Sequence, residues 1–159
     1  MYKKFFVVIF LFLINNFEVK AQILSFNDLK YLCDNNIEKT DSFLLNKGFV
    51  IIESDVNDIE SKYSWAFNRS IINSRASTFI SKQCHSYSCS WIWVQLTSLE
   101  KYNKIREQCK IKGFKLIETK NDSFGNLRFI YKLGNYEISF TSGLNENNIN
   151  EYFINLYKL

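Results

Sequence analysis

Short runs of alternating apolar and polar residues follow one another along most of the chain. Side chains on a β-strand point alternately to opposite faces, so this alternation predicts strands with one buried face. The predicted strands are 47–54, 63–68, 76–82 and 91–97, then 112–119, 127–132, 136–141 and 152–157. The last run also fits a helical stripe, but its counterpart 91–97 alternates cleanly, and we therefore interpret 152–157 as a strand.

Ahead of each set of four runs the apolar period lengthens to three or four residues, which predicts helices. Ser98 is a suitable N-cap for a helix whose apolar face carries Leu99, Tyr102, Ile105 and Cys109, and Gly113 suits its end. Earlier in the chain, Ser25 and Asp28 form a capping-box pattern before Leu29, Leu32 and Cys33. A second short helix is predicted over 41–46, ending at Gly48.

The phrase Lys-Gly-Phe begins at Lys47 and again at Lys112, each time just before a predicted strand. The two phrases divide the chain into a first repeat of about 25–97 and a second of about 98–159. Each repeat is predicted to contain one or more helices followed by a four-stranded antiparallel sheet. Gly134-Asn135 and the segment 121–126 supply turns for such a meander. The fold class is therefore α+β, with the helices on one face.

The first twenty-one residues have the pattern of a cleavable signal peptide. Lys3 and Lys4 precede an apolar stretch over 5–14, and Val19 and Ala21 stand at the −3 and −1 positions of a cleavage site. The apolar stretch is shorter than the roughly 20 residues that span a membrane. We expect residues 22–159 to form one secreted or periplasmic domain with no further membrane span.

The charge balance excludes an obvious nucleic-acid partner. Lysine and arginine number 20 against 16 aspartates and glutamates, and both signs are mixed along the chain. Nucleic-acid binding normally requires a clustered basic face. We find no motif for a cofactor, and we expect none.

Four cysteines, Cys33, Cys84, Cys89 and Cys109, lie beyond the signal pattern. An even number in an oxidising compartment indicates disulfides. Cys84 and Cys89 stand on either side of a hairpin turn and form one candidate bond, which leaves Cys33 to pair with Cys109. Buried free thiols are the alternative for either pair.

The order of helix, four strands, helix and four strands in an exported chain resembles the tandem architecture of the bacterial beta-lactamase inhibitor protein family. Small exported bacterial proteins with a helix, a Lys-Gly-Phe phrase and strands are also similar. The resemblance covers residues 25–157 and implies the fold and a bias toward protein binding. No inhibitory residue is carried over, because no motif here matches one.

Residues for catalysis or metal binding are few. His85 is the only histidine and lies in the loop with Ser86 and Ser88, without a third group to orient it. Cys84, His85 and Cys89 fall short of the four ligands of a structural zinc site. We interpret His85 as an exposed loop residue and expect no metal and no enzymatic activity.

The aromatic residues, 17% of the chain, sort by strand face. If Ile92, Val94 and Leu96 point to the core, Trp91 and Trp93 point to the open face, where they form a flat apolar platform. In the second repeat the predicted core set is Phe114, Leu116, Leu127, Phe129, Tyr131, Tyr136, Ile138, Phe140, Ile154 and Leu156. The candidate binding residues are Trp91, Trp93, Phe153, Tyr157, Arg128 and Lys132.

These features predict an exported binding or inhibitor-like module that contacts another exported or envelope protein through the open sheet face. A carbohydrate-binding module is the first alternative, because two tryptophans serve sugars equally well. A small hydrolase with an unrecognised site is the second. Both binding hypotheses require an accessible platform. The strand must direct the tryptophans away from the core, and no loop may cover them.

Overall fold

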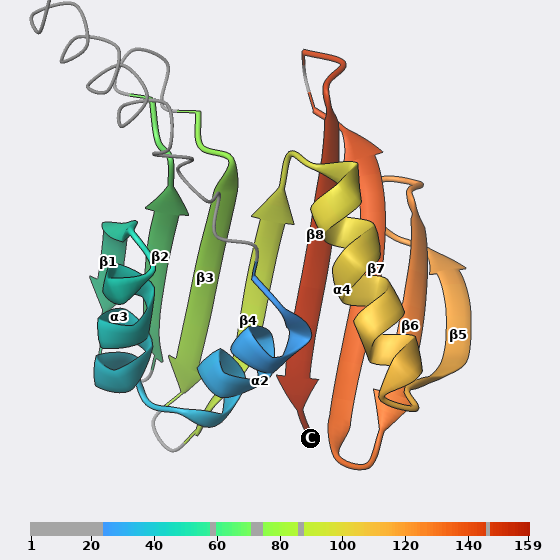
Figure 1. Ribbon diagram of the computed structural model, residues 1–159, viewed down its shortest axis with the longest axis horizontal. Helices are drawn as coiled ribbons and strands as arrows, with labels where there is room; N and C mark the ends of the chain where they lie inside the picture. The colour runs from blue at the N-terminus through green and yellow to red at the C-terminus, as the bar shows by residue number, and fades with distance from the viewer. Residues whose placement is uncertain (1–23, 58–59, 71–74, 86–87, 146) are drawn as a thin grey trace, which may run out of the picture.

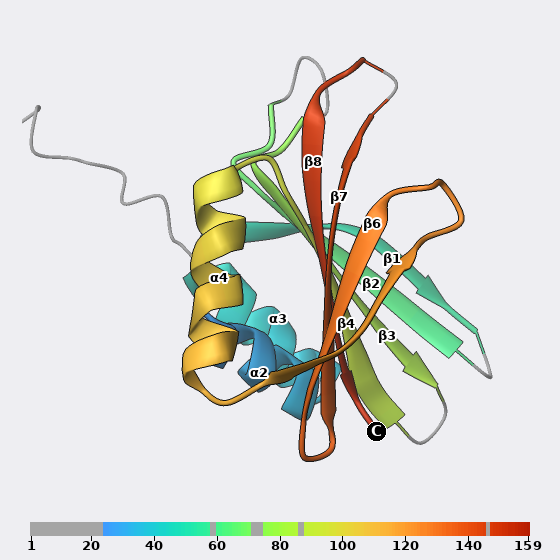
Figure 2. The same cartoon turned by 90° about the vertical axis from the view of Figure 1, so that its right-hand side faces the viewer.

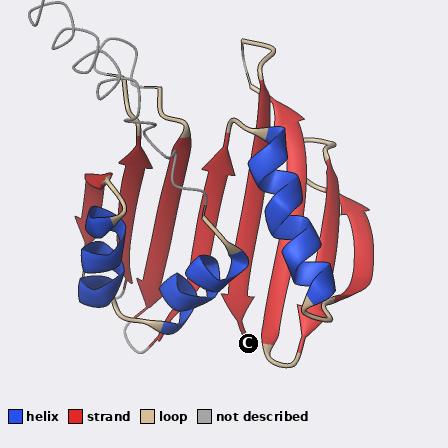
Figure 3. Cartoon of the chain, viewed as in Figure 1, coloured by secondary structure: helices blue, strands red, loops and turns tan. Residues whose placement is uncertain are grey.

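Three helices and eight strands make up the part of the chain that the computed structural model describes, namely residues 24–57, 60–70, 75–85, 88–145 and 147–159. Helices α2 (Phe26–Asp34) and α3 (Ile37–Asn46) precede four strands, and α4 (Leu99–Ile111) precedes four more (Figures 1 and 3). The strands are β1 (Phe49–Val56), β2 (Glu60–Phe67), β3 (Thr78–His85), β4 (Ser88–Leu96), β5 (Lys115–Asn121), β6 (Leu127–Leu133), β7 (Tyr136–Leu144) and β8 (Asn150–Lys158). The predicted signal peptide 1–21 lies outside the described residues.

All eight strands belong to one antiparallel sheet with the order β1-β2-β3-β4-β8-β7-β6-β5. Strands β4 and β8 pair at its centre, where Trp91 lies opposite Tyr157 and Val94 opposite Ile154. The three helices lie on the same face of this sheet (Figure 2). The α+β class, the antiparallel strands and the placement of the helices are thus confirmed, and 152–157 is a strand.

The helix ends follow the capping residues. Ser25 Oγ accepts a hydrogen bond from the Asp28 amide at 3.2 Å, and Ser98 Oγ accepts one from the Lys101 amide at 3.3 Å. After α3 and α4, Gly48 and Gly113 adopt φ of +80° and +90°, which only glycine adopts without strain. The predicted helix 41–46 was too short, because Asn36 caps α3 and the helix therefore begins at Ile37.

The core lies between the helices and one face of the sheet. Ile92, Val94 and Leu96 are at most 2% exposed, so the predicted register of β4 is confirmed. Leu116 and Leu127, predicted as core, are 53% and 47% exposed. Leu116 lies on the edge strand β5 and Leu127 at the start of β6, whereas α4 reaches β6 through Arg106, which lies over Phe129 and Tyr131. Both leucines are therefore beyond the part of the helix-facing side that α4 covers.

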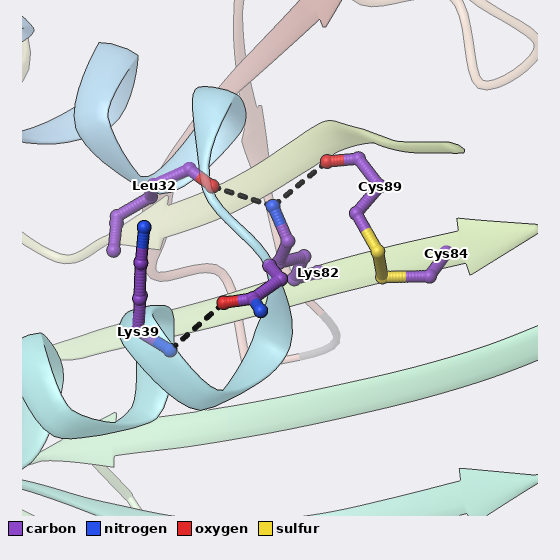
Figure 4. The surroundings of a disulfide bond; sticks show 6 residues. Leu32, Lys39, Lys82, Cys84 and Cys89 are labelled. Atoms are coloured by element: carbon purple, nitrogen blue, oxygen red, sulfur yellow. Dashed lines mark hydrogen bonds between the residues drawn. A yellow bond between two sulfur atoms is a disulfide. The ribbon is translucent and has the colours of Figure 1, made fainter. Parts of the chain in front are cut away.

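A disulfide joins Cys84 on β3 to Cys89 on β4, as predicted (Figure 4). The second pairing is wrong, because Cys33 and Cys109 are buried free thiols. The amide of Phe26 donates to Gln108 Oε1 at 2.8 Å, so the first turn of α2 lies beside the end of α4. Cys33 lies near the other end of α2, where its Sγ donates to the backbone oxygen of Ser90 on β4 at 3.1 Å.

Removing this bond is expected to have a modest effect on stability. In the chain-entropy model a ring of this length contributes about 2 kcal/mol or less. The double variant Cys84→Ser and Cys89→Ser should therefore lose no more than that in urea unfolding, and reductant should not destabilise it further. A double variant that fails to fold would contradict the view that the bond holds only one hairpin.

Lys82 is a fully buried lysine on the helix-facing side of β3. Its Nζ donates to the backbone oxygen of Leu32, in the last turn of α2, and to that of Cys89 at 2.8 Å (Figure 4). These two acceptors offset part of the cost of removing the amino group from water. Burial lowers the pKa of Lys82 to about 8, against a smaller upward effect of Cys33 and Asp34.

Candidate functional site

The sheet face opposite the three helices, here called the open face, carries the candidate binding residues. Trp91 and Trp93 point to it because Ile92 and Val94, between and beside them, fill the core. The pairing of β4 with β8 brings Phe153 and Tyr157 to the same face. The structure thus gathers all four predicted aromatic residues at the centre of the sheet.

The four aromatic rings form two stacked pairs rather than a flat platform. Trp91 stacks on Tyr157 with ring centroids 5.9 Å apart and an interplanar angle of 9°. Trp93 stacks on Phe153 at 5.7 Å and 27°. All four side chains are partly buried, so each ring covers part of its partner and still reaches the surface.

A cleft of about 630 Å³, called the main cleft below, opens beside the second stack. Trp93, Phe153 and Asn155 line it from β4 and β8, and Arg128 and Thr141 line it from β6 and β7. The far wall consists of Asp122, Ser123, Phe124 and Asn126 from the β5–β6 turn, with Gly143 and Leu144. The sequence predicted Trp93, Phe153 and Arg128 as binding residues but did not indicate this wall.

Hydrogen bonds within the β5–β6 turn hold the far wall in place. Asp122 Oδ1 accepts from the amides of Phe124 and Asn126 at 2.9 and 2.8 Å. Desolvation raises the pKa of Asp122, but these bonds and the Arg128 charge together lower it below its ordinary value. The turn leaves Phe124 87% exposed at its tip. A Cβ at Gly143 would lie 3.0 Å from Asn126 Nδ2, so glycine permits the close contact between β7 and this turn.

Arg128 presents a positive group to the main cleft without a partner from the described residues. Its Nε is buried and makes no hydrogen bond there. Asp122 is the other charged residue that lines the cleft, but the two do not form an ion pair. Lys132, the second predicted cation, lies opposite Glu137 on the open face, does not line the cleft and is exposed.

A smaller hollow of about 230 Å³ lies on the other side of Trp93, over strands of the first half. Ile52, Glu53, Lys62, Ser64, Phe79, Ser81 and Gln95 line it together with Trp93. Glu53 and Lys62 pair there at 3.6 Å. Trp93 is therefore shared by both hollows and separates them.

Among the described residues, those considered for zinc do not form a site, and Ser86, considered for catalysis, lies outside the described residues. His85 is exposed at the end of β3. Cys84 and Cys89 are bonded to each other, so their sulfurs are not thiolate ligands. Within the described residues no group of three or more histidines, cysteines, aspartates or glutamates is placed to hold a metal ion, and no helix is long and apolar enough to cross a membrane.

Comparison with known proteins gives no match: no family model fits the chain, and no curated protein or solved structure is significantly similar to it. The resemblance to the beta-lactamase inhibitor architecture accordingly stays a prediction.

Proposed function

We propose that the chain is an exported, non-enzymatic module that binds another protein through the open face. The observation that carries this proposal is the position of Trp93, which is partly buried, stacked on Phe153 and shared by two hollows. Tryptophan, tyrosine and arginine are enriched among the residues that dominate the energetics of protein interfaces, and these residues cluster in well-packed pockets near the interface centre. The open face offers all three residue types.

The stacking geometry favours a protein over a carbohydrate as the ligand. Sugar rings bind flat against uncovered aromatic faces, but here each ring covers part of its partner. Side chains of a protein instead insert into hollows beside aromatic residues, and the main cleft, with its apolar and polar wall, suits such insertion. Carbohydrate binding is the alternative function, and a glycan array would reveal it.

The Cys84–Cys89 bond supports export. Disulfides persist in oxidising compartments and are rare in the cytosol. Together with the signal pattern of residues 1–21, the bond supports a secreted or periplasmic location for residues 22–159.

The proposal of a tandem repeat has support from the strand pairing. Both edge strands carry a β-bulge two residues after the phenylalanine of the Lys-Gly-Phe phrase, between Ile51 and Glu53 in β1 and between Leu116 and Glu118 in β5. Bulges are specific features of a strand rather than defects. On this proposal the open face combines strands from two copies of one unit.

Capture of a partner from the native envelope tests the proposed function. The wild-type protein is expected to retain a specific protein, and Trp93→Ala to reduce its capture at least tenfold, as for a central interface residue. Ile111→Ala is the matched control, because Ile111 is 85% exposed on α4, away from the open face. Equal capture by the wild type and Trp93→Ala would refute binding through the open face, and a glycan bound in place of any protein would favour the carbohydrate alternative.

A further inference from the structure

Arg128 is the residue of the main cleft whose bonding within the protein is incomplete. Its Nε is removed from water and has no hydrogen-bond acceptor among the described residues. A buried donor without an acceptor destabilises the protein, and more so when the group is charged. Arg128 as a whole is partly exposed and lines the main cleft, so a ligand there can supply an acceptor for its guanidinium.

Asp122 lies near Arg128, but its carboxylate already accepts hydrogen bonds from other groups. Its carboxylate accepts from two backbone amides and from the side chain of Asn126. Moving it onto Arg128 would break the bonds that hold the β5–β6 turn. The positive charge in the main cleft thus remains available to a group from outside.

The shape and charge of the Arg128 guanidinium indicate which chemical group of a ligand would bind it. A guanidinium presents parallel N–H donors that match a carboxylate, and charge-assisted bonds of this kind are stronger than neutral ones. Beside Arg128, the rings of Trp93 and Phe153 and the side chains of Phe124 and Leu144 form apolar walls. The cleft therefore combines one site for a carboxylate with room for an apolar side chain.

Resting on the proposed function, we infer that the main cleft recognises an acidic segment of a partner protein, with an aspartate or glutamate side chain bound by Arg128 next to an apolar residue that packs on Trp93 and Phe153. An internal segment fits better than a chain terminus, because the main cleft and the smaller hollow lie on either side of Trp93. A segment that continues past Trp93 occupies both hollows. A terminal carboxylate would occupy one.

Selection from a phage-displayed library of random linear 12-residue peptides tests this inference on the full exported chain. Peptides enriched on the wild type, relative to Trp93→Ala, are expected to carry an aspartate or glutamate beside an apolar residue. For a synthetic copy of an enriched peptide, exchanging that acid for its amide should weaken binding at least tenfold. This exchange leaves the protein unchanged and thus avoids any effect on folding.

Protein variants give the complementary measurement. Arg128→Gln should weaken binding of the same peptide at least tenfold, and Lys115→Gln, exposed on the neighbouring strand β5 and outside the cleft, should change it less than twofold. Peptides that bind equally well as acid and amide, or that bind Arg128→Gln like the wild type, would overturn the role of the carboxylate. If Trp93→Ala still abolished peptide binding in that case, the result would support the proposed function.

Two further outcomes overturn the inference. If no peptide is enriched on the wild type above Trp93→Ala, the main cleft does not bind a linear acidic segment, although capture of a folded partner could still succeed. If the wild type binds oligogalacturonate, and Arg128→Gln does not, the carboxylate belongs to an acidic sugar.

Discussion

Replacing Ile92 by alanine is expected to lower the free energy of unfolding by about 2–5 kcal/mol, the usual cost of truncating a buried aliphatic side chain. Ile92 is completely buried at the centre of the sheet, opposite Leu156. The change removes apolar contacts and leaves a cavity that rigid neighbouring strands cannot easily fill. Chemical denaturation, with unchanged dependence on denaturant, measures the loss directly.

Trp91→Ala and Trp93→Ala are the matched comparison, since both residues neighbour Ile92 but point to the open face. Their rings are partly exposed, and the free energy of unfolding should fall much less than for Ile92→Ala. The comparison depends on side-chain direction, because a shift of one residue in register exchanges the two faces. Larger losses for the tryptophan variants would show that the stacked rings are core, and the proposed binding face would lose its main support.

Lys82→Met is expected to change how stability depends on pH. The pKa of Lys82 is about 8 in the folded protein and 10.5 as the reference value for an unfolded chain. Between these values the unfolded state binds more protons, so the free energy of unfolding of the wild type rises with pH. From pH 6 to pH 10 the gain from Lys82 is on the order of 2–3 kcal/mol.

Methionine has a similar length and does not titrate, so the gain should be absent in Lys82→Met. The variant also leaves the oxygens of Leu32 and Cys89 without this donor, which adds a constant loss that does not depend on pH. Burial raises the pKa of Cys33 to about 11 and that of Cys109 to about 12, and both thiols lower stability above pH 9. The Lys82 charge also acts on the Cys33 pKa, so the two proteins are best compared from pH 6 to pH 9. The difference between the two denaturation series is therefore the quantity to measure. Parallel series would show that Lys82 remains charged throughout.

Local sequence patterns predicted the helices and strands well, because the residues that specify each of them lie within a few positions of one another. Alternation around Ile92 set the faces of β4, and Ser25, Ser98, Gly48 and Gly113 marked helix ends. The single sheet could not be predicted in the same way. The pairing of Trp91 with Tyr157 joins residues far apart in sequence, and no local pattern specifies which strand becomes the neighbour of β4.

The candidate site likewise has parts that local sequence patterns predict and parts that depend on how the sheet assembles. Trp93, Phe153 and Arg128 were predicted from alternation alone, since each has a side chain on the open face. The β5–β6 turn was predicted as a turn, but its role as the wall of a cleft depends on how the sheet places it beside Trp93. Lys82 escaped notice because lysine usually lies at the surface, and the two backbone oxygens that accept its bonds come from other elements.

The pairing of β4 with β8 also makes the two halves of the chain depend on each other for folding. Helix α2, from the first half, packs on β4 and β8, and α4, from the second half, packs on the same two strands. Each half thus covers a central strand of the other, so the halves should unfold in one cooperative transition. A ligand that contacts both Trp93 and Phe153 bridges this junction from the opposite face. Binding would then raise the melting temperature of the whole domain as ligand concentration rises.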